Sequence, residues 1–305
     1  MGSSPKKTVI TICGPTATGK TSVAIELAKY FHTEIISADS RQCFKELNIG
    51  VARPGEEDLR QVKHHFIASH RIQQDISAAT FEQYALKKAT ELFQHHDVII
   101  MVGGTGLYIK AFCEGLDAIP EVPVVAREKM IHDYETNGLS WLQNEIRAKD
   151  PEFYKTGEMR NPQRMMRALE VKQATGQSIL SFHKGEKVKR DFTIIKIGLR
   201  LPKEELNRNI NTRVNKMIKA GLMDEVKRLL AFKDLNALQT VGYSELFDYF
   251  GGKMTLPEAI EKIKINTRQY AKRQMTWFKK DPAIKWFAPA QVKEMIEWAD
   301  KINKS

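Results

Sequence analysis

A motif near the N-terminus restricts the fold of this 305-residue chain more than any other feature of its sequence. Residues 14–21 match the pattern G-x-x-x-x-G-K-[ST] at every fixed position. They follow a short apolar, β-branched segment at 8–13 and precede a helical pattern at 21–31, so the motif lies in the strand–loop–helix context that it requires. The eight residues are Gly14, Pro15, Thr16, Ala17, Thr18, Gly19, Lys20 and Thr21.

Such a loop binds phosphate mainly through its backbone. The glycines allow backbone N–H groups to turn toward an anion, and the start of the following helix adds partial positive charge. Lys20 brings a full positive charge, and the Thr21 hydroxyl is placed to bind Mg²⁺. We therefore predict a phosphate-binding site with Mg²⁺ as its cofactor, although the motif does not identify the phosphate compound.

Strands and helices alternate along the first part of the chain. Segments 34–38 and 98–102 are typical of buried strands, and 81–94 has helical periodicity. This alternation predicts an α/β fold of the P-loop NTPase type, in which a parallel sheet is flanked by helices.

The middle of the chain departs from this pattern. Residues 120–189 have helical periodicity without a convincing strand, and 191–201 then indicate a strand that rejoins the sheet. We therefore predict a discontinuous core domain, residues 1–115 and 191–305, interrupted by an all-helical insertion domain, residues 116–190.

The C-terminal part is expected to be helical beyond Pro202, with an interruption at 242–252 and a last short apolar segment at Trp286-Phe287. Within it, residues 268–280 form a helical pattern rich in Lys and Arg. This pattern fits either a helix that contacts phosphates or an amphipathic helix with a solvated basic side.

The composition indicates which partners the protein binds and in which compartment it is found. The net charge of +11 and the pI near 9.4 fit either a nucleic-acid partner or a solvated basic surface. No apolar run reaches the ~18 residues of a membrane span, so we expect no membrane association. Cys13, Cys43 and Cys113 are far apart and odd in number, which predicts reduced thiols in a cytoplasmic protein.

One carboxylate lies at the same sheet edge as the loop. Asp39 directly follows the strand predicted at 34–38, where it would hold Mg²⁺ through water, take a proton from a nucleophile, or cap the N-terminus of a helix. The later strand ends instead in Gly103-Gly104 without an acid, which weakens a nucleoside-triphosphatase interpretation. The turn that follows offers the Thr105 hydroxyl, although a plain tight turn explains it as well.

Five segments together resemble the tRNA dimethylallyltransferase family, also called tRNA isopentenyltransferases. They run in order through nearly the whole chain: GPTATGKT at 14–21, SADSRQCFKELNIGVARP at 37–54, VGGTGLYIKA at 102–111, NPQRMMRALEV at 161–171 and RQYAKRQMTWF at 268–278. The resemblance implies transfer of a dimethylallyl group from dimethylallyl diphosphate to N6 of adenine 37, beside the anticodon of tRNA. It also implies that the loop holds the donor's diphosphate rather than a nucleotide.

The resemblance assigns roles to residues of this chain. It implies that Asp39 is the general base and that the diphosphate is contacted by Thr16 and an arginine of a later helix, Arg213 or its neighbour Arg208. It implies that the insertion domain and the core bind the anticodon stem-loop, and we expect a monomer. The implied tRNA contacts are Asp39, Ser40, Arg41, Gln42, Thr105, Arg127, Gln163, Arg164, Met165, Met166 and Arg167.

Three other functions use the same features. A nucleotide or metabolite kinase would use the loop for ATP and need no tRNA. A related transferase would prenylate free adenine nucleotides, although a small acceptor requires neither the long insertion nor the basic helices. A non-catalytic RNA-binding protein would not require an intact phosphate loop together with Asp39.

Overall fold

The computed structural model describes residues 6–303, and the chain divides into two compact units. The first combines residues up to Glu114 with those from Lys189 onward, and the second is Gly115–Val188. The first unit contains one six-stranded parallel sheet in the order β3-β2-β4-β1-β5-β6. Its strands are β1 (Thr8–Cys13), β2 (Ile35–Ala38), β3 (His64–His65), β4 (Val98–Gly103), β5 (Thr193–Leu199) and β6 (Ile284–Phe287).

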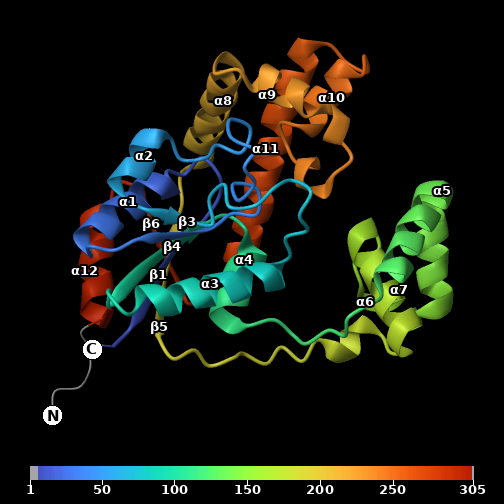
Figure 1. Ribbon diagram of the computed structural model, residues 1–305, viewed down its shortest axis with the longest axis horizontal. Coiled ribbons are helices and arrows are strands. Elements are labelled where there is room, and N and C mark those ends of the chain that lie inside the picture. The colour runs from blue at the N-terminus through green and yellow to red at the C-terminus, as the bar shows by residue number, and fades with distance from the viewer. Residues whose placement is uncertain (1–5, 304–305) are drawn as a thin grey trace. The chain divides into compact units, whose positions relative to one another are not determined.

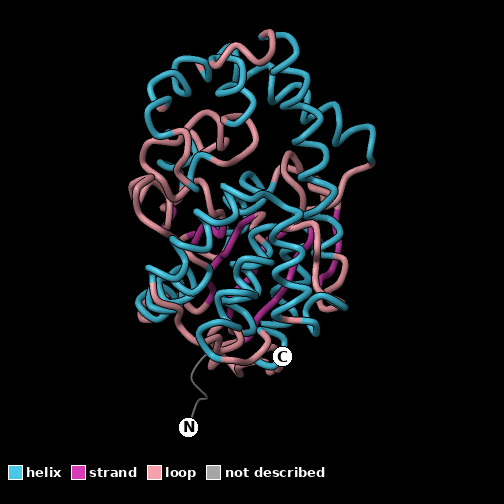
Figure 2. Tube along the Cα trace, turned by 90° about the vertical axis from the view of Figure 1, so that its right-hand side faces the viewer, coloured by secondary structure: helices cyan, strands magenta, loops and turns pink. Residues whose placement is uncertain are grey.

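Helices cover both faces of this sheet, and Figure 2 shows the strands as an inner layer. Successive β1 residues alternate between the faces, so Val9 belongs to one core cluster and Ile10 to the other. The Ile10 face packs on α1 (Lys20–Tyr30) and α12 (Val292–Asn303), which lie side by side in Figure 1. The Val9 face packs on α3 (Ala78–Leu92), α4 (Gly106–Glu114) and α11 (Leu256–Phe278).

The parallel α/β fold predicted from the alternation is confirmed, as is the strand that rejoins the sheet after the insertion. Three details of the prediction were wrong or incomplete. The expected interruption at 242–252 contains the helix α10 (Ser244–Phe250), and α12 follows the segment at Trp286. Neither α2 (Glu56–Gln61) nor β3 was predicted, because α2 buries no residue and β3 has only two, so neither leaves an apolar period.

Two further helices extend the first unit near the phosphate loop. They are α8 (Lys203–Lys219) and α9 (Leu222–Arg228). The buried Glu225 of α9 accepts hydrogen bonds from the N–H groups of Ile49 and Gly50, at 2.8 and 3.0 Å, and from the Tyr243 hydroxyl at 2.5 Å. These bonds fix the loop that follows β2, which matters because that loop lines the candidate site.

The second unit has helices and no strand among its residues, as the periodicity predicts. Its elements are α5 (Val124–Lys149), α6 (Pro151–Thr156), α7 (Pro162–Thr175) and a 3-10 turn (Ile179–Phe182). Gly138, with φ of 76°, breaks α5 into two helical parts. Asp150 caps α6 and accepts a hydrogen bond from Ser178 at 2.9 Å. This buried polar pair joins the start of α6 to the start of the 3-10 turn.

Two findings bear on the expectations from composition. No helix within residues 6–303 is both long enough and apolar enough to cross a membrane. Cys13, Cys43 and Cys113 are buried free thiols.

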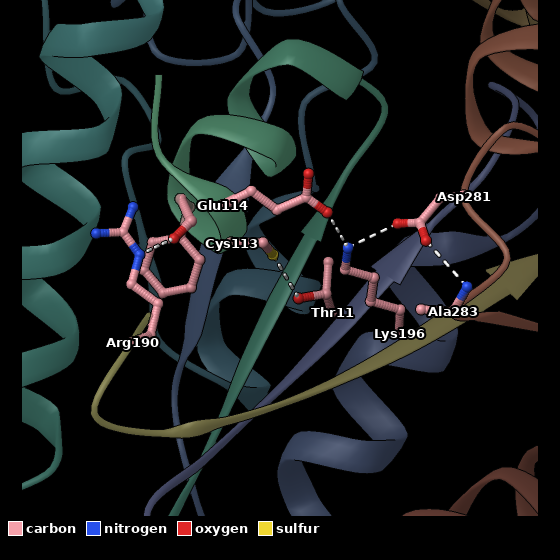
Figure 3. A network of polar contacts seen from close by, with 8 residues as sticks. Thr11, Cys113, Glu114, Arg190, Lys196, Asp281 and Ala283 are labelled. Carbon is pink, nitrogen blue, oxygen red and sulfur yellow. Dashed lines mark hydrogen bonds and ion pairs between the residues drawn. The ribbon is translucent and has the colours of Figure 1, made fainter. Parts of the chain in front are cut away.

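A partly buried network of ion pairs lies on the Val9 face of the sheet (Figure 3). Lys196 of β5 donates to Glu114 at 2.9 Å and to Asp281 at 2.6 Å, and Asp281 also accepts from the backbone N–H of Ala283 at 2.9 Å. Burial alone would lower the pKa of Lys196, but the two carboxylates outweigh it and raise this pKa above its ordinary value. Lys196 therefore ties the end of α4 to the segment after α11.

The network gives a first prediction. Lys196→Met removes the ammonium group that contacts Glu114 and Asp281, so we expect the free energy of unfolding to fall by about 2–3 kcal/mol, less than for a fully buried pair because both carboxylates keep some exposure. Urea denaturation measures the change. The matched control is Lys253→Met, which removes an exposed pair with Asp248 and should cost no more than about 0.5 kcal/mol. Equal losses in the two variants would contradict a role for the network.

Candidate active site

The predicted phosphate loop has the geometry of an anion cradle between β1 and α1. Gly14 has φ of 135°, and a Cβ there would lie 2.5 Å from the Leu199 carbonyl oxygen, so only glycine fits. Gly19, with φ of 84°, is the residue before α1, and no side chain caps that helix. The N–H groups at the start of α1 therefore remain available to an anion.

Hydrogen bonds inside the loop keep it closed. The Thr18 hydroxyl and the Lys20 ammonium both donate to the Pro15 carbonyl oxygen, at 2.8 and 2.7 Å. Burial, followed by repulsion from Arg213, lowers the pKa of Lys20 to about 8, although Asp39 acts in the opposite direction. Without a ligand, Lys20 therefore loses its positive charge as the pH rises above about 8.

Helix α8 contacts the loop through the arginine that the resemblance implied. Arg213 donates from Nη1 to the Thr16 hydroxyl at 3.0 Å, and Asn209 donates to the Ala17 carbonyl oxygen at 3.3 Å. Burial lowers the pKa of Arg213. Arg208 is exposed and lines none of the cavities at the loop. The geometry therefore favours Arg213 over Arg208 as the arginine beside the loop.

Helix α11 contributes a residue that the sequence analysis missed. Gln274 is buried, accepts from the N–H of Thr16 at 2.8 Å and donates to the Gly104 carbonyl oxygen at 2.8 Å. It thereby joins the phosphate loop to the Gly-rich turn after β4. A Cβ on Gly104 would lie 2.3 Å from Gln274 Nε2, so that glycine is needed for the contact. The signal in the sequence was a polar residue in the buried stripe Ala271, Gln274 and Phe278.

Asp39 follows β2 and uses one of its two carboxylate oxygens in the fold. Its Oδ1 accepts from the backbone N–H groups of Arg41 and Gln42, at 2.9 and 3.1 Å. Thus the capping alternative describes part of its role, on a turn rather than an α-helix. No hydrogen bond reaches Oδ2 from residues 6–303, so this oxygen remains available to a substrate.

The remaining polar residues of this edge hold the turns together. The Thr105 hydroxyl accepts from the N–H of Ser40 at 3.0 Å, so it links the turn after β4 to the turn after β2. Gln42 donates to the carbonyl oxygens of Val51 and Ala52, at 3.2 and 3.0 Å. These bonds give Thr105, Ser40 and Gln42 structural roles beside the tRNA contacts predicted for them.

Two cavities in the first unit meet at this edge. The smaller, about 170 Å³, is lined by Gly19, Lys20 and Thr21 of the loop, and the larger, about 520 Å³, extends toward the segment 239–245. The residues that line both cavities are Thr16, Asp39, Val51, Ala52, Arg213 and Tyr270. The predicted base and the predicted diphosphate residues therefore meet where the two cavities adjoin.

The second unit contains the other residues predicted to contact tRNA. Arg127, Gln163 and Arg164 are exposed, and Arg164 pairs with Glu158 at 2.6 Å. Arg167 is partly exposed and donates to Glu170 and to the Pro120 carbonyl oxygen, each at 3.4 Å.

The position of Met165 and Met166 corrects one prediction. Both side chains are buried in the hydrophobic core of the second unit, on the inward face of α7, with 0% and 4% exposure. They therefore pack with residues such as Leu142 and Ile146 and do not present a surface to tRNA. The two methionines form part of the apolar face of α7, whereas polar residues such as Gln163 and Arg164 lie on its exposed face.

An α/β fold with a phosphate loop, a carboxylate and a basic residue at one sheet edge is typical of enzymes that bind phosphate compounds. Comparison with known proteins identifies the family. Residues 42–281 match the model of the family described as IPP transferase. The tRNA dimethylallyltransferase of Christiangramia forsetii is 50% identical over 279 residues, 92% of either chain. The tRNA dimethylallyltransferase 1 of Bacteroides thetaiotaomicron is 45% identical over 95% of this chain and 94% of that protein.

Solved structures agree with these relatives. The tRNA isopentenylpyrophosphate transferase of Bacillus halodurans superimposes with a TM-score of 0.72 at 32% identity, covering 98% of this chain and 97% of that one. A eukaryotic dimethylallyltransferase acting on tRNA gives 0.71 at 25% identity, covering 89% of this chain and 69% of that one. The chain therefore belongs to the tRNA dimethylallyltransferase family, and the resemblance seen in its motifs is confirmed.

The lowered pKa of Lys20 gives a second prediction. A bound diphosphate favours the charged ammonium, so binding above pH 8 should be accompanied by proton uptake, and affinity should fall as the pH rises through about 8. Calorimetric titration with inorganic pyrophosphate, in buffers of different ionisation enthalpy, measures the uptake. Lys20→Arg is the control, because its side chain stays charged and any proton uptake by this variant comes from pyrophosphate or from other groups. The difference in uptake between the two proteins is the part due to Lys20. The same uptake in both proteins would show that Lys20 does not titrate in the site.

Proposed function

We propose that this chain transfers a dimethylallyl group from dimethylallyl diphosphate to N6 of adenine 37, next to the anticodon of tRNA. Family membership supports an enzyme of this class. The observation that carries the residue assignments is the meeting of Thr16, Asp39 and Arg213 where the two cavities adjoin. A donor bound in the smaller cavity and an acceptor bound in the larger one would react at that junction.

The diphosphate would bind in the loop Gly14–Thr21. The free N–H groups at the start of α1, the charge of Lys20 and the Arg213 guanidinium would balance its negative charge. When the allylic C–O bond breaks, an electron pair stays on the leaving oxygen, so the same groups would stabilise the transition state more than the bound donor.

The site also suits Mg²⁺. Thr21 and Asp39 line the same cavity and offer hydroxyl and carboxylate oxygens, the ligand types that Mg²⁺ prefers. No group of three or more His, Cys, Asp or Glu side chains converges within residues 6–303, so the diphosphate and water would supply most ligands. Bound Mg²⁺ would contribute charge neutralisation at the diphosphate.

The acceptor end depends on Asp39. The exocyclic amine of adenine is a weak nucleophile and must lose a proton as the new C–N bond forms. The free Oδ2 of Asp39 would accept this proton while Oδ1 stays fixed by two backbone N–H groups. Val51, Ala52 and Tyr270 would surround the dimethylallyl group, since they line the junction with apolar or aromatic surface.

Both units would take part in binding tRNA. Arg127, Gln163, Arg164 and Arg167 of the second unit are side chains suited to sugar-phosphate and to unstacked bases of a single-stranded loop. The target adenine must leave its stack, which costs a few kcal/mol and least in such a loop. The proposed catalytic residues all belong to one unit of one chain, which supports catalysis by a monomer. Membership of a family that acts on tRNA supports a cytoplasmic location.

The base assignment gives a third prediction. Asp39→Asn keeps an Oδ1 acceptor for Arg41 and Gln42 but removes the proton acceptor, so turnover should fall by ~10² or more. Binding of tRNA, measured by filter retention or fluorescence anisotropy, should change little. Asp39→Ala also loses the hydrogen bonds to Arg41 and Gln42. Comparing the two variants separates the role of Asp39 in the turn from its role as a base. Unchanged turnover in Asp39→Asn would eliminate Asp39 as the base.

The reaction itself is tested with a labelled donor. Incubation with labelled dimethylallyl diphosphate and Mg²⁺ should label tRNA that carries an adenine at position 37, whereas free AMP should remain unlabelled. A tRNA with guanine at position 37 is the control acceptor. Label in AMP would favour the prenylation of free nucleotides, and consumption of ATP with no effect of tRNA would favour a kinase.

A further inference from the structure

His64 has a buried ring nitrogen without a hydrogen-bond partner among residues 6–303, and the residue lines the smaller cavity beside the phosphate loop. The residue lies in β3 and pairs in register with Ile35 of β2. Its Nδ1 is 2.8 Å from the Val62 carbonyl oxygen. A carbonyl oxygen only accepts, so Nδ1 carries the hydrogen and Nε2 of the neutral ring carries a lone pair. Nε2 is buried and has no hydrogen-bond partner within residues 6–303.

The surroundings of His64 indicate what would satisfy Nε2. His64 lines the same cavity as Lys20, Thr21 and Arg213, which we assign to the donor's diphosphate. Leaving a buried polar atom unpaired is unfavourable, and such an atom at a cleft calls for an explanation. Ionised phosphate oxygens only accept hydrogen bonds, so they can pair with Nε2 only when this nitrogen is protonated.

We propose that His64 is a further diphosphate-binding residue, which takes up a proton at Nε2 when the anion binds and then donates a hydrogen bond to it. The proposal rests on the assignment of the loop Gly14–Thr21 to a diphosphate. The balance is one neutral imidazole, one proton from solvent and one anion, giving an imidazolium bound to that anion. Nδ1 keeps its hydrogen bond to Val62 throughout, so the ring need not turn.

Burial, more than any nearby charge, favours the neutral form of His64 until the anion arrives. Burial lowers its pKa most; the hydrogen bond to Val62 and the Asp58 carboxylate act in the opposite direction, and His65 lowers the pKa further. His65 is itself engaged by Glu34 at 2.5 Å. The anion would add the negative charge that the site lacks. The charged or titratable side chains that face this site are Lys20, Asp39, Asp58, His65, Arg213 and Tyr270.

This proton uptake differs from that of Lys20 in its pH range. Lys20, with a pKa of about 8, gains its proton on binding mainly above pH 8. His64, with a pKa below the ordinary value for histidine, would gain its proton on binding near neutral pH. The diphosphate product should therefore bind more tightly as the pH falls from 7.5 toward 6, for a reason that Lys20→Arg leaves intact.

The experiment compares the full-length protein with His64→Gln in calorimetric titrations with inorganic pyrophosphate at about pH 7. The glutamine amide can reach the Nε2 position but does not titrate. Wild-type protein should take up close to one proton more than His64→Gln. His64→Leu should bind pyrophosphate about ten- to a hundredfold more weakly, the loss expected for one charged hydrogen bond. His95→Gln, an exposed histidine outside these cavities, is the matched control and should behave as wild type.

A second readout observes the ring directly. In a nitrogen NMR spectrum the Nε2 signal of His64 should move from the unprotonated to the protonated range when pyrophosphate is added, with or without Mg²⁺. A signal that stays unprotonated and responds only when Mg²⁺ is present would assign Nε2 to a metal-bound water and overturn the proposal. Equal proton uptake in wild type and His64→Gln would overturn it as well.

The controls separate this proposal from the function on which it rests. Lys20→Ala should abolish pyrophosphate binding if the loop is the diphosphate site. If the wild-type protein fails to bind pyrophosphate, the loop assignment itself is wrong. If it binds and loses affinity in Lys20→Ala but not in His64→Leu, only the role of His64 is wrong. Circular dichroism of each variant, compared with wild type, verifies that the fold is retained.

Discussion

The geometry of the active site depends on how Thr16 is held by two helices from the far end of the chain. Gln274 of α11 accepts from its N–H, and Arg213 of α8 donates to its hydroxyl, across sequence separations of 258 and 197 residues. The shape of the phosphate loop therefore depends on residues that follow both the second unit and β5 in the sequence. Substitutions in α8 or α11 can thus disturb phosphate binding while the loop motif stays intact.

The positive charge of the site is a second constraint, and it follows from the contact between α8 and the phosphate loop. Bringing α8 onto the loop places Arg213 near Lys20, and this repulsion adds to burial in lowering the pKa of the lysine. Asp39 offsets only part of that charge. A cationic cavity of this kind is unfavourable in the free protein and becomes favourable once an anion fills it. Under the proposed function, the positive charge that is unfavourable in the free site would stabilise negative charge on the leaving oxygen.

The fold could be predicted from the sequence because local patterns determine it. Buried strands and the strand–loop–helix motif leave signals within about ten residues, and so does the helical period of the insertion. The roles of Gln274 and His64 and the burial of Met165 and Met166 could not be predicted from the sequence. In each case the property depends on a contact between elements far apart in the chain, or on which face of a helix turns inward. A polar residue in a buried stripe was the one local signal of Gln274, and it does not name a partner.

The two interpretations of Asp39, turn cap and general base, are compatible because a carboxylate has two oxygens. Oδ1 is held by the N–H groups of Arg41 and Gln42, which limits rotation of the side chain and directs Oδ2 to one position. If Asp39 is the base, as we propose, a carboxylate that is already fixed would lose little entropy when the amine arrives, so the cap would contribute to catalysis through orientation. The same turn is anchored to β4 through Ser40 and Thr105 and to the loop after β2 through Gln42. Residues that the resemblance assigns to tRNA contacts therefore also hold the turn that carries Asp39, so replacing Ser40 or Thr105 would shift the proposed base even where tRNA binding is retained.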